Sequence, residues 1–435
     1  MRTPLLAVIL AALVLGPPAR GAPTADLPDR PLTLEDCAAI ALRSNPQMVS
    51  SRQRIVSARA GVTTSRSGYY PQVSLSAVEG LTNGGAGASS GADTREELDL
   101  SLRMTFWQQG RRAGVQQSRA SLRAADLTHA STTQSLVEQV AGDYYGVLAA
   151  RQLLAVAEEG VTLAQDHLEE VKARIAAGAE AEVDVFSVED DLAQAQLDAI
   201  DARSSVRLAF ATLKNSMGLP PGTQLELAQA PPPGEEAVPA LQEAIATALE
   251  NRPDLFASRA SVEASGYALA QAKIERGPVA DVSGQYSHQT TQWEDSDSSW
   301  DLLLSVSWPL FDGHAAEAAE TSARAALKQQ EADLEALGNE IALQVESALV
   351  EVERTRERLQ ASQVSVAAAE ARLAAAEGKY RQNVGILLEV TDARASVTSA
   401  RATQVQARYD AQIALVGLKR VLGTLAVPAA TEPTP

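Results

Sequence analysis

Residues 140–175 read VAGDYYGVLAARQLLAVAEEGVTLAQDHLEEVKARI, with an apolar residue at every seventh position. Four of these apolar residues, Val147, Leu154, Val161 and Leu168, are each followed three positions later by a second apolar residue that is usually smaller. This seam consists of Val140, Val147, Leu154, Val161, Leu168 and Ile175, with Ala150, Ala157, Ala164 and Val171 beside it. A hydrophobic repeat of 3.5 residues is typical of helices that supercoil around one another.

The same seam recurs 205 residues later in the chain. It consists there of Val345, Val352, Leu359, Val366, Leu373 and Tyr380, with Ala348, Thr355, Ser362, Ala369 and Ala376 beside it. Each run of helix would be about 100 Å long at 1.5 Å per residue, far beyond an ordinary globular helix. Such rods must lie along one another in a tube or a stalk.

The two halves of the chain share one order of elements, which indicates internal duplication. Leu213-Lys214-Asn215-Ser216-Met217-Gly218 matches Leu418-Lys419-Arg420-Val421-Leu422-Gly423, again 205 residues apart. We expect the following organisation along the chain: a signal peptide at 1–21; a first repeat at 22–218 with a β-hairpin at 71–107, a long helix at 111–177 and a return helix at 183–217; a linker at 219–239 with one possible short strand at 224–227; a second repeat at 240–424 with a β-hairpin at 278–310, a long helix at 314–382 and a return helix at 387–422; and a disordered tail at 425–435.

Each hairpin contains a strand in which apolar and polar residues alternate, the pattern of a strand with one face in lipid and one in water. The expected lipid-facing residues are Leu98, Leu100, Leu102, Met104 and Phe106 in the first hairpin, and Trp300, Leu302, Leu304, Val306 and Trp308 in the second. A soluble, half-buried hairpin would show the same alternation. The aromatic residues at the strand ends and the signal peptide favour the membrane. Because four strands cannot close a barrel, several chains would have to contribute strands to one.

Composition narrows the function further. The formal net charge is −18, and removal of the signal peptide with its two arginines would make it −20. A nucleic-acid partner is therefore excluded, since phosphate binding requires a basic face. No run of 18 apolar residues occurs, so any membrane insertion must use strands. The single cysteine, Cys37, cannot form an internal disulfide, and the acidic residues before it argue against lipidation.

No pattern in the chain indicates catalysis, a metal site or a cofactor. Gly87-Ala88-Ser89-Ser90-Gly91 matches G-x-S-x-G but lies in the tip of a hairpin rather than on a strand-to-helix turn. The histidines, at 129, 167, 288 and 314, lack the spacing of metal ligands.

Carboxylates gather at the two turns between long and return helices. Asp184 in the first turn and Glu389 in the second are equivalent by the shift of 205, and Asp392 lies one helical turn after Glu389. An acid at the start of a helix is favoured by the helix dipole, and this is the better explanation for Glu180 and Glu182. Glu389 and Asp392 share one face and could also form acidic rings at the narrow end of a tube.

The signal peptide, the duplicated order of elements and the turn Tyr380–Asp392 (YRQNVGILLEVTD) together resemble the TolC family of outer-membrane efflux ducts. The resemblance covers roughly residues 32–425. It implies a homotrimer in which four strands per chain close a twelve-stranded barrel, continued by an α-helical barrel across the periplasm. Asp184, Tyr380, Glu389 and Asp392 match residues of the periplasmic gate in that family. Gly385 departs from the best-known member, which has a gate-locking arginine there.

We therefore expect a mainly α-helical protein that acts as a passive exit duct in the outer membrane of a Gram-negative bacterium and extends into the periplasm. The resemblance implies a periplasmic adaptor and an inner-membrane pump as partners, with outer-membrane lipid around the strands and no cofactor. A structural or adhesive coiled-coil surface stalk without transport is the alternative, although a stalk has no use for lipid-facing strands. The cargo, whether drugs, metals or proteins, does not follow from the sequence.

Overall fold

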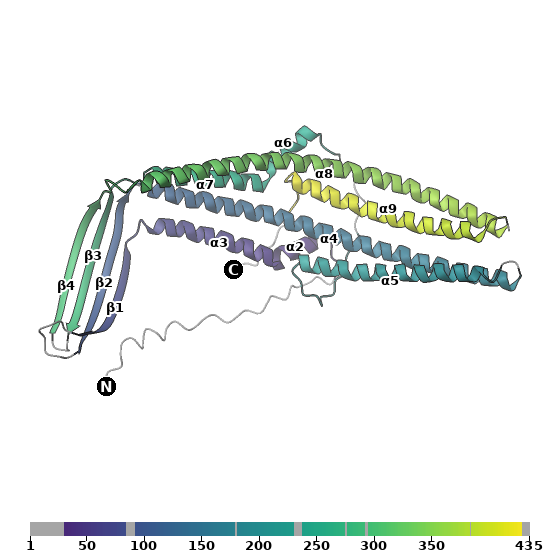
Figure 1. The fold of residues 1–435 in the computed structure, drawn as a ribbon, viewed down its shortest axis with the longest axis horizontal. Helices are drawn as coiled ribbons and strands as arrows, with labels where there is room; N and C mark the ends of the chain where they lie inside the picture. Colours follow the sequence, from purple (N-terminus) through teal and green to yellow (C-terminus); the bar gives the residue numbers. More distant parts are fainter. Residues whose placement is uncertain are drawn as a thin grey trace.

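The computed structural model describes residues 30–83, 92–178, 181–229, 237–274, 276–291, 295–382 and 384–428. The expected signal peptide, the G-x-S-x-G segment at 87–91 and most of the expected tail lie outside these ranges. Long helices lie side by side along the molecule, and a small sheet stands at one end of them (Figure 1). This mainly helical architecture with a small antiparallel sheet confirms the predicted fold class.

Each repeat contributes four helices and two strands within the described ranges, in the same order. The first contains α2 (Leu34–Ser44), α3 (Pro46–Ser67), β1 (Gln72–Asn83), β2 (Ala92–Gln108), α4 (Arg111–Ala176) and α5 (Asp184–Ser216). The second contains α6 (Leu241–Asn251), α7 (Pro253–Lys273), β3 (Val279–Thr291), β4 (Asp295–Ser307), α8 (Ala315–Arg381) and α9 (Leu387–Val421). With 66 and 67 residues, α4 and α8 are each about 100 Å long.

The joint between α2 and α3 is defined by local chemistry. Asn45 accepts a hydrogen bond from the backbone N–H of Gln47 (2.7 Å), and Pro46 then starts α3, where a missing N–H costs nothing. Gly218, just beyond the end of α5, packs onto this joint with a positive φ of 70°. A Cβ at position 218 would lie 2.6 Å from the carbonyl oxygen of Ser44. Gly423 meets the joint between α6 and α7 in the same way, so the duplication extends to backbone contacts.

Helix α4 occupies the middle of a curved wall of helices. It packs against α3 and α7 towards the sheet, and against α5 and α9 towards the other end. Helix α8 packs against α7 and α9 on the side away from α3 and α5. The wall therefore has the order α3–α4–α7–α8 near the sheet and α5–α4–α9–α8 beyond it. All twelve predicted apolar residues of the two seams are buried or half-buried in these contacts.

The middle of the molecule contains the larger core. Leu32, Leu219 and Leu227 pack there with apolar residues of α2, α4 and the end of α5. Leu219 and Leu227 of the expected linker are thus packed against the wall. The possible strand at 224–227 is reduced to a single parallel bridge between Leu32 and Leu227.

The four strands form one antiparallel sheet of order β1-β2-β3-β4. The register places apolar residues opposite one another: Leu75 faces Leu100, Leu100 faces Tyr286, and Tyr286 faces Trp300. Because side chains alternate across a strand, one face of the sheet carries most of the apolar side chains, and the other is mainly polar. Towards the hairpin tips the first face also carries Glu79, Glu96 and His288. Among the expected lipid-facing residues Leu102 and Met104 are half-buried, and the other eight are exposed in the single chain.

Two details modify the simple strand pattern. A β-bulge between Thr105 and Trp107 interrupts the pairing of β2 with β3, and it contains Phe106. Trp308 lies just beyond the end of β4, and its indole N–H donates to the carbonyl oxygen of Arg276 (3.0 Å). In the part of the chain that the structure describes, no helix has both the length and the apolarity needed to cross a bilayer.

The close approach of Gly218 to the α2–α3 joint predicts a specific weakness. Gly218→Ala combines an unfavourable positive φ with a clash against backbone atoms. We therefore expect the free energy of unfolding to fall by about 2–4 kcal/mol and the thermal midpoint, measured by circular dichroism, to be clearly lower. Gly222→Ala is the matched control, since a Cβ there meets nothing within 4 Å. Equal midpoints for the two variants would contradict the packing described for the joint.

Candidate functional site

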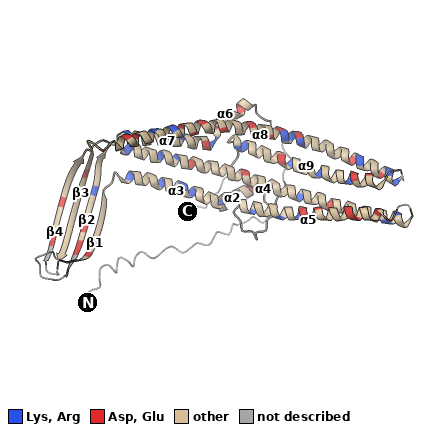
Figure 2. Ribbon diagram, in the orientation of Figure 1, with Lys and Arg blue, Asp and Glu red and all other residues tan. Residues whose placement is uncertain are grey.

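The two turns between long and return helices lie at the end of the wall away from the sheet (Figure 1). One joins α4 to α5 and the other joins α8 to α9. Acidic residues gather along the start of α5, as Figure 2 shows. Since α9 packs against α4 along this end, the two hairpins can only move apart by breaking contacts between these helices.

Tyr380 lies one residue before the end of α8 and is buried, with 3% of its surface exposed. It packs with Ala376 of α8 and with Val390 and Ala393 of α9 in a small apolar cluster that closes the second hairpin. Its ring also faces the first hairpin. The guanidinium of Arg174 on α4 lies 4.3 Å from the ring centroid, a cation–π contact.

His167 on α4 belongs to the same contact. Its imidazole is buried, with 2% exposed, and its ring centroid lies 6.2 Å from that of Tyr380 in an edge-on arrangement. The sequence assigned His167 no role, because a single histidine on a helix carries no spacing signal. The structure places it between the hairpins, where it fills space against the tyrosine.

Two arginines of α9 tie the hairpins together more directly. Arg394 donates to the backbone carbonyl oxygen of Leu163 on α4 (2.9 Å) and to the carboxylate of Glu377 on α8 (3.0 Å). One heptad further along α9, Arg401 pairs with Glu159 on α4 (2.7 Å) and with Glu370 on α8 (2.8 Å). We call Arg394 and Arg401 the arginine pair. Each member bridges the same three helices, so the pair holds the first hairpin against the second.

The arginine pair was not identified from the sequence, although a signal was present. Arg394 and Arg401 are seven residues apart, as are Glu370 and Glu377, so each set repeats on one helix face. The spacing within one helix does not reveal that α4 supplies the third partner.

The predicted carboxylates occupy different positions at this end. Glu389 and Asp392 are exposed on α9 and point away from the hairpin core, whereas Asp184 is half-buried at the first residue of α5. Within the described residues, the structure shows no hydrogen bond between Asp184 and Tyr380. An acid in the first turn of α5 is also where the helix dipole favours negative charge.

Asp392 acts on a residue that the sequence did not single out. Burial raises the pKa of Asp191 on α5, and the nearby carboxylates of Asp190 and Asp392 raise it further. A raised pKa means that this arrangement disfavours the charged form. While both carboxylates are charged, Asp191 and Asp392 therefore repel each other across the two hairpins, and the repulsion disappears when Asp191 is protonated.

Gly385 has a structural explanation in the α8–α9 turn. A Cβ at this position would lie 3.0 Å from the Cβ of Lys379 and 3.0 Å from the backbone nitrogen of Tyr380. The Gly385 N–H donates back to the carbonyl oxygen of Lys379 (3.2 Å). A larger residue, such as the arginine of the best-known TolC family member, would therefore force this turn to rearrange.

Both turns also expose large apolar residues: Val183 and Phe186 in the first, and Val384, Ile386 and Leu388 in the second. Exposed fractions of 61–76% at Val384, Ile386 and Leu388 are unusual for side chains of this kind. Val183 and Leu388 are equivalent by the shift of 205, so the duplication gives both turns an apolar surface.

Several known outer-membrane proteins are similar to this chain. The Campylobacter jejuni CmeC outer membrane channel superimposes with a TM-score of 0.80 at 15% identity, covering 91% of this chain and 86% of that one. Protein CyaE of Bordetella pertussis is 27% identical over 310 residues, which cover 70% of this chain and 65% of that protein. Outer membrane protein TolC of Vibrio cholerae is 26% identical over 182 residues, which cover 41% of this chain and 40% of that protein. The alignments thus span less than two thirds of either relative by sequence.

The fold is that of outer-membrane channel proteins. Residues 38–219 and 244–424 each match the family described as outer membrane efflux protein, and this chain belongs to that family. The two separate matches coincide with the two repeats. Membership of this family places the protein in the outer membrane.

The arginine pair predicts how the hairpins respond to substitution. Arg394→Ala together with Arg401→Ala removes the bridges between α4, α8 and α9. We expect the free energy that favours closely packed hairpins over separated ones to fall by about 2 kcal/mol. Spin labels at Val183→Cys and Val384→Cys should then report a longer and broader distance between the two turns. Cys37 does not interfere with labelling, because burial raises the pKa of its thiol to about 12.

Arg354→Ala serves as the control for this measurement. Arg354 forms an ion pair with Glu351 on its own helix (2.6 Å), so this pair does not connect two helices. An unchanged distance distribution in the Arg394/Arg401 variant would show that the pair does not hold the hairpins together.

Proposed function

We propose that three copies of this chain form a closed, water-filled exit duct that passively conducts substrates from an inner-membrane pump across the periplasm and the outer membrane. The observation that carries the proposal is the arrangement of unsatisfied edges in the single chain. Strand β1 and helices α3 and α5 lie along one edge of the molecule, and strand β4 and helix α8 lie along the other. Head-to-tail contacts between unlike edges close into a ring.

Apolar residues on both edges support this assembly. On α8, Leu343, Val350 and Val364 follow a heptad spacing outside the seam and are 57–67% exposed. On the opposite edge, α5 exposes Leu197, Ile200 and Leu208, and α3 exposes Val49 and Val56. Exposed apolar rows of this kind are expected where a helix packs against another chain, because a surface helix of a soluble monomer normally has polar residues on its outer face.

The sheet supplies the membrane-spanning part of the proposal. Three copies would give twelve strands with the apolar face towards lipid and the polar face towards the bore. The alternation then serves the function directly, because lipid requires the first face and water the second. A surface stalk would leave both the apolar face and the strand edges without a role.

The exposed apolar turns support docking of a periplasmic adaptor at the tip. Val384, Ile386 and Leu388 lie between the exposed Lys379 and Arg381 and the exposed Glu389, so the tip combines an apolar surface with charges of both signs. An adaptor with an apolar patch flanked by charged residues would complement it. The duct itself does no chemistry in this proposal, and the pump supplies the energy and selects the cargo.

We assign Asp184, Tyr380, Glu389 and Asp392 to the gate at this tip. Tyr380 and the arginine pair hold the hairpins together, while Glu389 and Asp392 would form acidic rings in the trimer. Rings of carboxylates raise the local concentration of cations and bind multivalent ones.

Glu389→Ala with Asp392→Ala should therefore weaken the cation selectivity of the pore. In planar bilayers, we expect the reversal potential in a salt gradient to move towards zero and block by multivalent cations to weaken by about tenfold. Glu331→Ala with Asp333→Ala removes the same number of charges from the part of α8 nearer the sheet and should change both quantities far less. Unchanged selectivity and block in the first variant would remove Glu389 and Asp392 from the gate.

The assembly has a separate readout. The duct predicts a heat-modifiable trimer in outer-membrane fractions, and the stalk predicts an elongated protein that is released without detergent. Release without detergent, together with the absence of conductance, would overturn the proposed function.

A further inference from the structure

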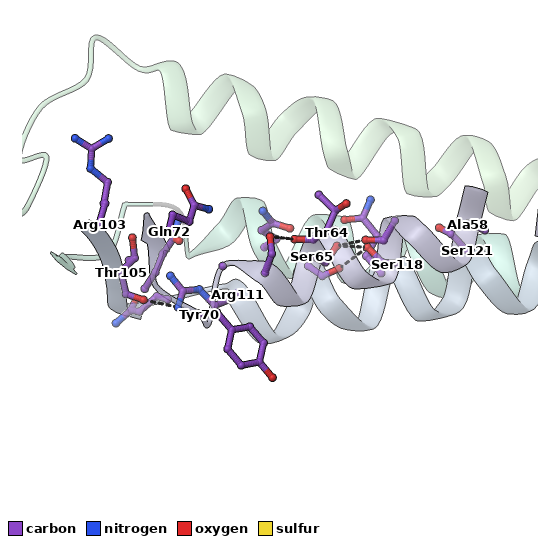
Figure 3. Close-up of a pocket in the computed structure, with 18 residues that line it drawn as sticks. Ala58, Thr64, Ser65, Tyr70, Gln72, Arg103, Thr105, Arg111, Ser118 and Ser121 are labelled. Atoms are coloured by element: carbon purple, nitrogen blue, oxygen red, sulfur yellow. Dashed lines mark hydrogen bonds between the residues drawn. The ribbon is translucent and has the colours of Figure 1, made fainter. Parts of the chain in front are cut away.

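A cavity of about 650 Å³ opens where the sheet meets the helices, between α3, α4 and the first strands (Figure 3). Its lining is unusual for this chain. Eighteen residues line it, among them two arginines, five glutamines, six serines or threonines and one tyrosine, and none is acidic. The whole chain, in contrast, has 55 acidic and 37 basic residues. The cavity is thus a local exception to the negative charge of the protein.

The two arginines are held differently. Arg111, the first residue of α4, donates from Nη1 to the carbonyl oxygen of Thr105 (2.6 Å) and lies 4.9 Å from the ring centroid of Tyr69. These contacts fix the guanidinium and leave its charge without a carboxylate partner among the described residues. Arg103 is exposed on β2, and it too has no ion pair in the part of the chain that the structure describes.

The surroundings of Arg103 do not neutralise it. Its partners across the sheet are Gln72 on β1 and Ser283 on β3, both uncharged. The hydroxyl of Thr105 donates a hydrogen bond to the carboxylate of Asp281 (2.6 Å), and Asp281 does not line the cavity. Glutamine, serine and threonine side chains then offer hydrogen bonds in both directions around the two positive charges.

Register fixes the side of the sheet on which the cavity lies. Gln72, Arg103 and Thr105 belong to the polar face, opposite the apolar residues that face lipid in the proposed trimer. The cavity therefore opens to the bore rather than to the membrane. This step rests on the proposed function, because only the assembled duct has a bore.

We propose that this cavity is a binding site for a small, soluble, multivalent anion, such as one bearing phosphate or carboxylate groups, in transit through the duct. Arg103 and Arg111 supply the charge, and the glutamine and hydroxyl side chains bind the remaining oxygen atoms. The site gives anionic cargo a favourable position in a passage that is otherwise acidic. Because it is open and one of its arginines is exposed, binding is weak and reversible, as passage requires.

Inorganic pyrophosphate is a suitable probe. The purified trimer in neutral detergent should bind it in isothermal titration calorimetry at low ionic strength, and the affinity should fall as salt is added. Arg103→Gln should lower the affinity by about tenfold, since it removes the exposed charge without disturbing the contacts of Arg111. Arg112→Gln is the matched control, because Arg112 neighbours Arg111 on α4, is exposed and does not line the cavity.

The outcomes separate this site from the duct itself. Absence of pyrophosphate binding, or an equal loss of affinity in the Arg103 and Arg112 variants, overturns the anion site. If bilayers show cation-selective pores while pyrophosphate does not bind, the site fails and the duct stands. If pyrophosphate binds through Arg103 while the protein forms no pores, the proposed function fails and the anion site stands without its role in transit.

Discussion

The unpaired edges of the sheet constrain everything else in this molecule. Strands β1 and β4 each leave one row of backbone N–H and C=O groups without a partner in the single chain, and one face of the sheet carries most of its apolar side chains. In a bilayer those groups cannot bond to water, so the edges must meet other strands. The outer helices also lack partners in the single chain, because α8 on one edge and α3 and α5 on the other expose rows of apolar side chains. In the proposed trimer, joining unlike edges of three copies would satisfy both at once.

The far end of the wall balances attraction against repulsion. The arginine pair and the contact of Tyr380 with Arg174 draw the two hairpins together, whereas Asp191 and Asp392 push them apart. Interactions of this kind are individually modest and depend on protonation and ionic strength. A tip held by several such contacts can open without unfolding, because the apolar seams along each hairpin remain intact.

Much of the fold could be predicted from the sequence because the deciding patterns are local. A heptad seam specifies a long helix and its buried side, and strict alternation specifies a strand and its two faces. The duplication doubled each signal. Gly385 departs from the pattern of the TolC family, and the structural reason lies in its close approach to Lys379 and Tyr380, which the sequence does not show.

The contacts between distant elements could not be predicted in the same way. Arg394 meets Leu163, 231 residues away, through a backbone carbonyl that has no sequence signature. His167 on α4 contacts Tyr380 of α8, and no pattern within α4 indicates that contact. The cavity around Arg103 combines residues of α3, α4, α7 and two strands, and no segment of the chain contains enough of them to indicate a site. Tertiary packing, rather than any local pattern, creates these features.

Cysteine cross-linking between the outer strands tests the central claim most directly. Single cysteines introduced along β1 and along β4 can be paired in one chain, with the inert Cys37 left in place. Closure by unlike edges predicts disulfides between β1 of one chain and β4 of the next, which yield covalent trimers on denaturing gels. Cross-links that join β1 to β1, or that join β1 to β4 within a single chain, would contradict it.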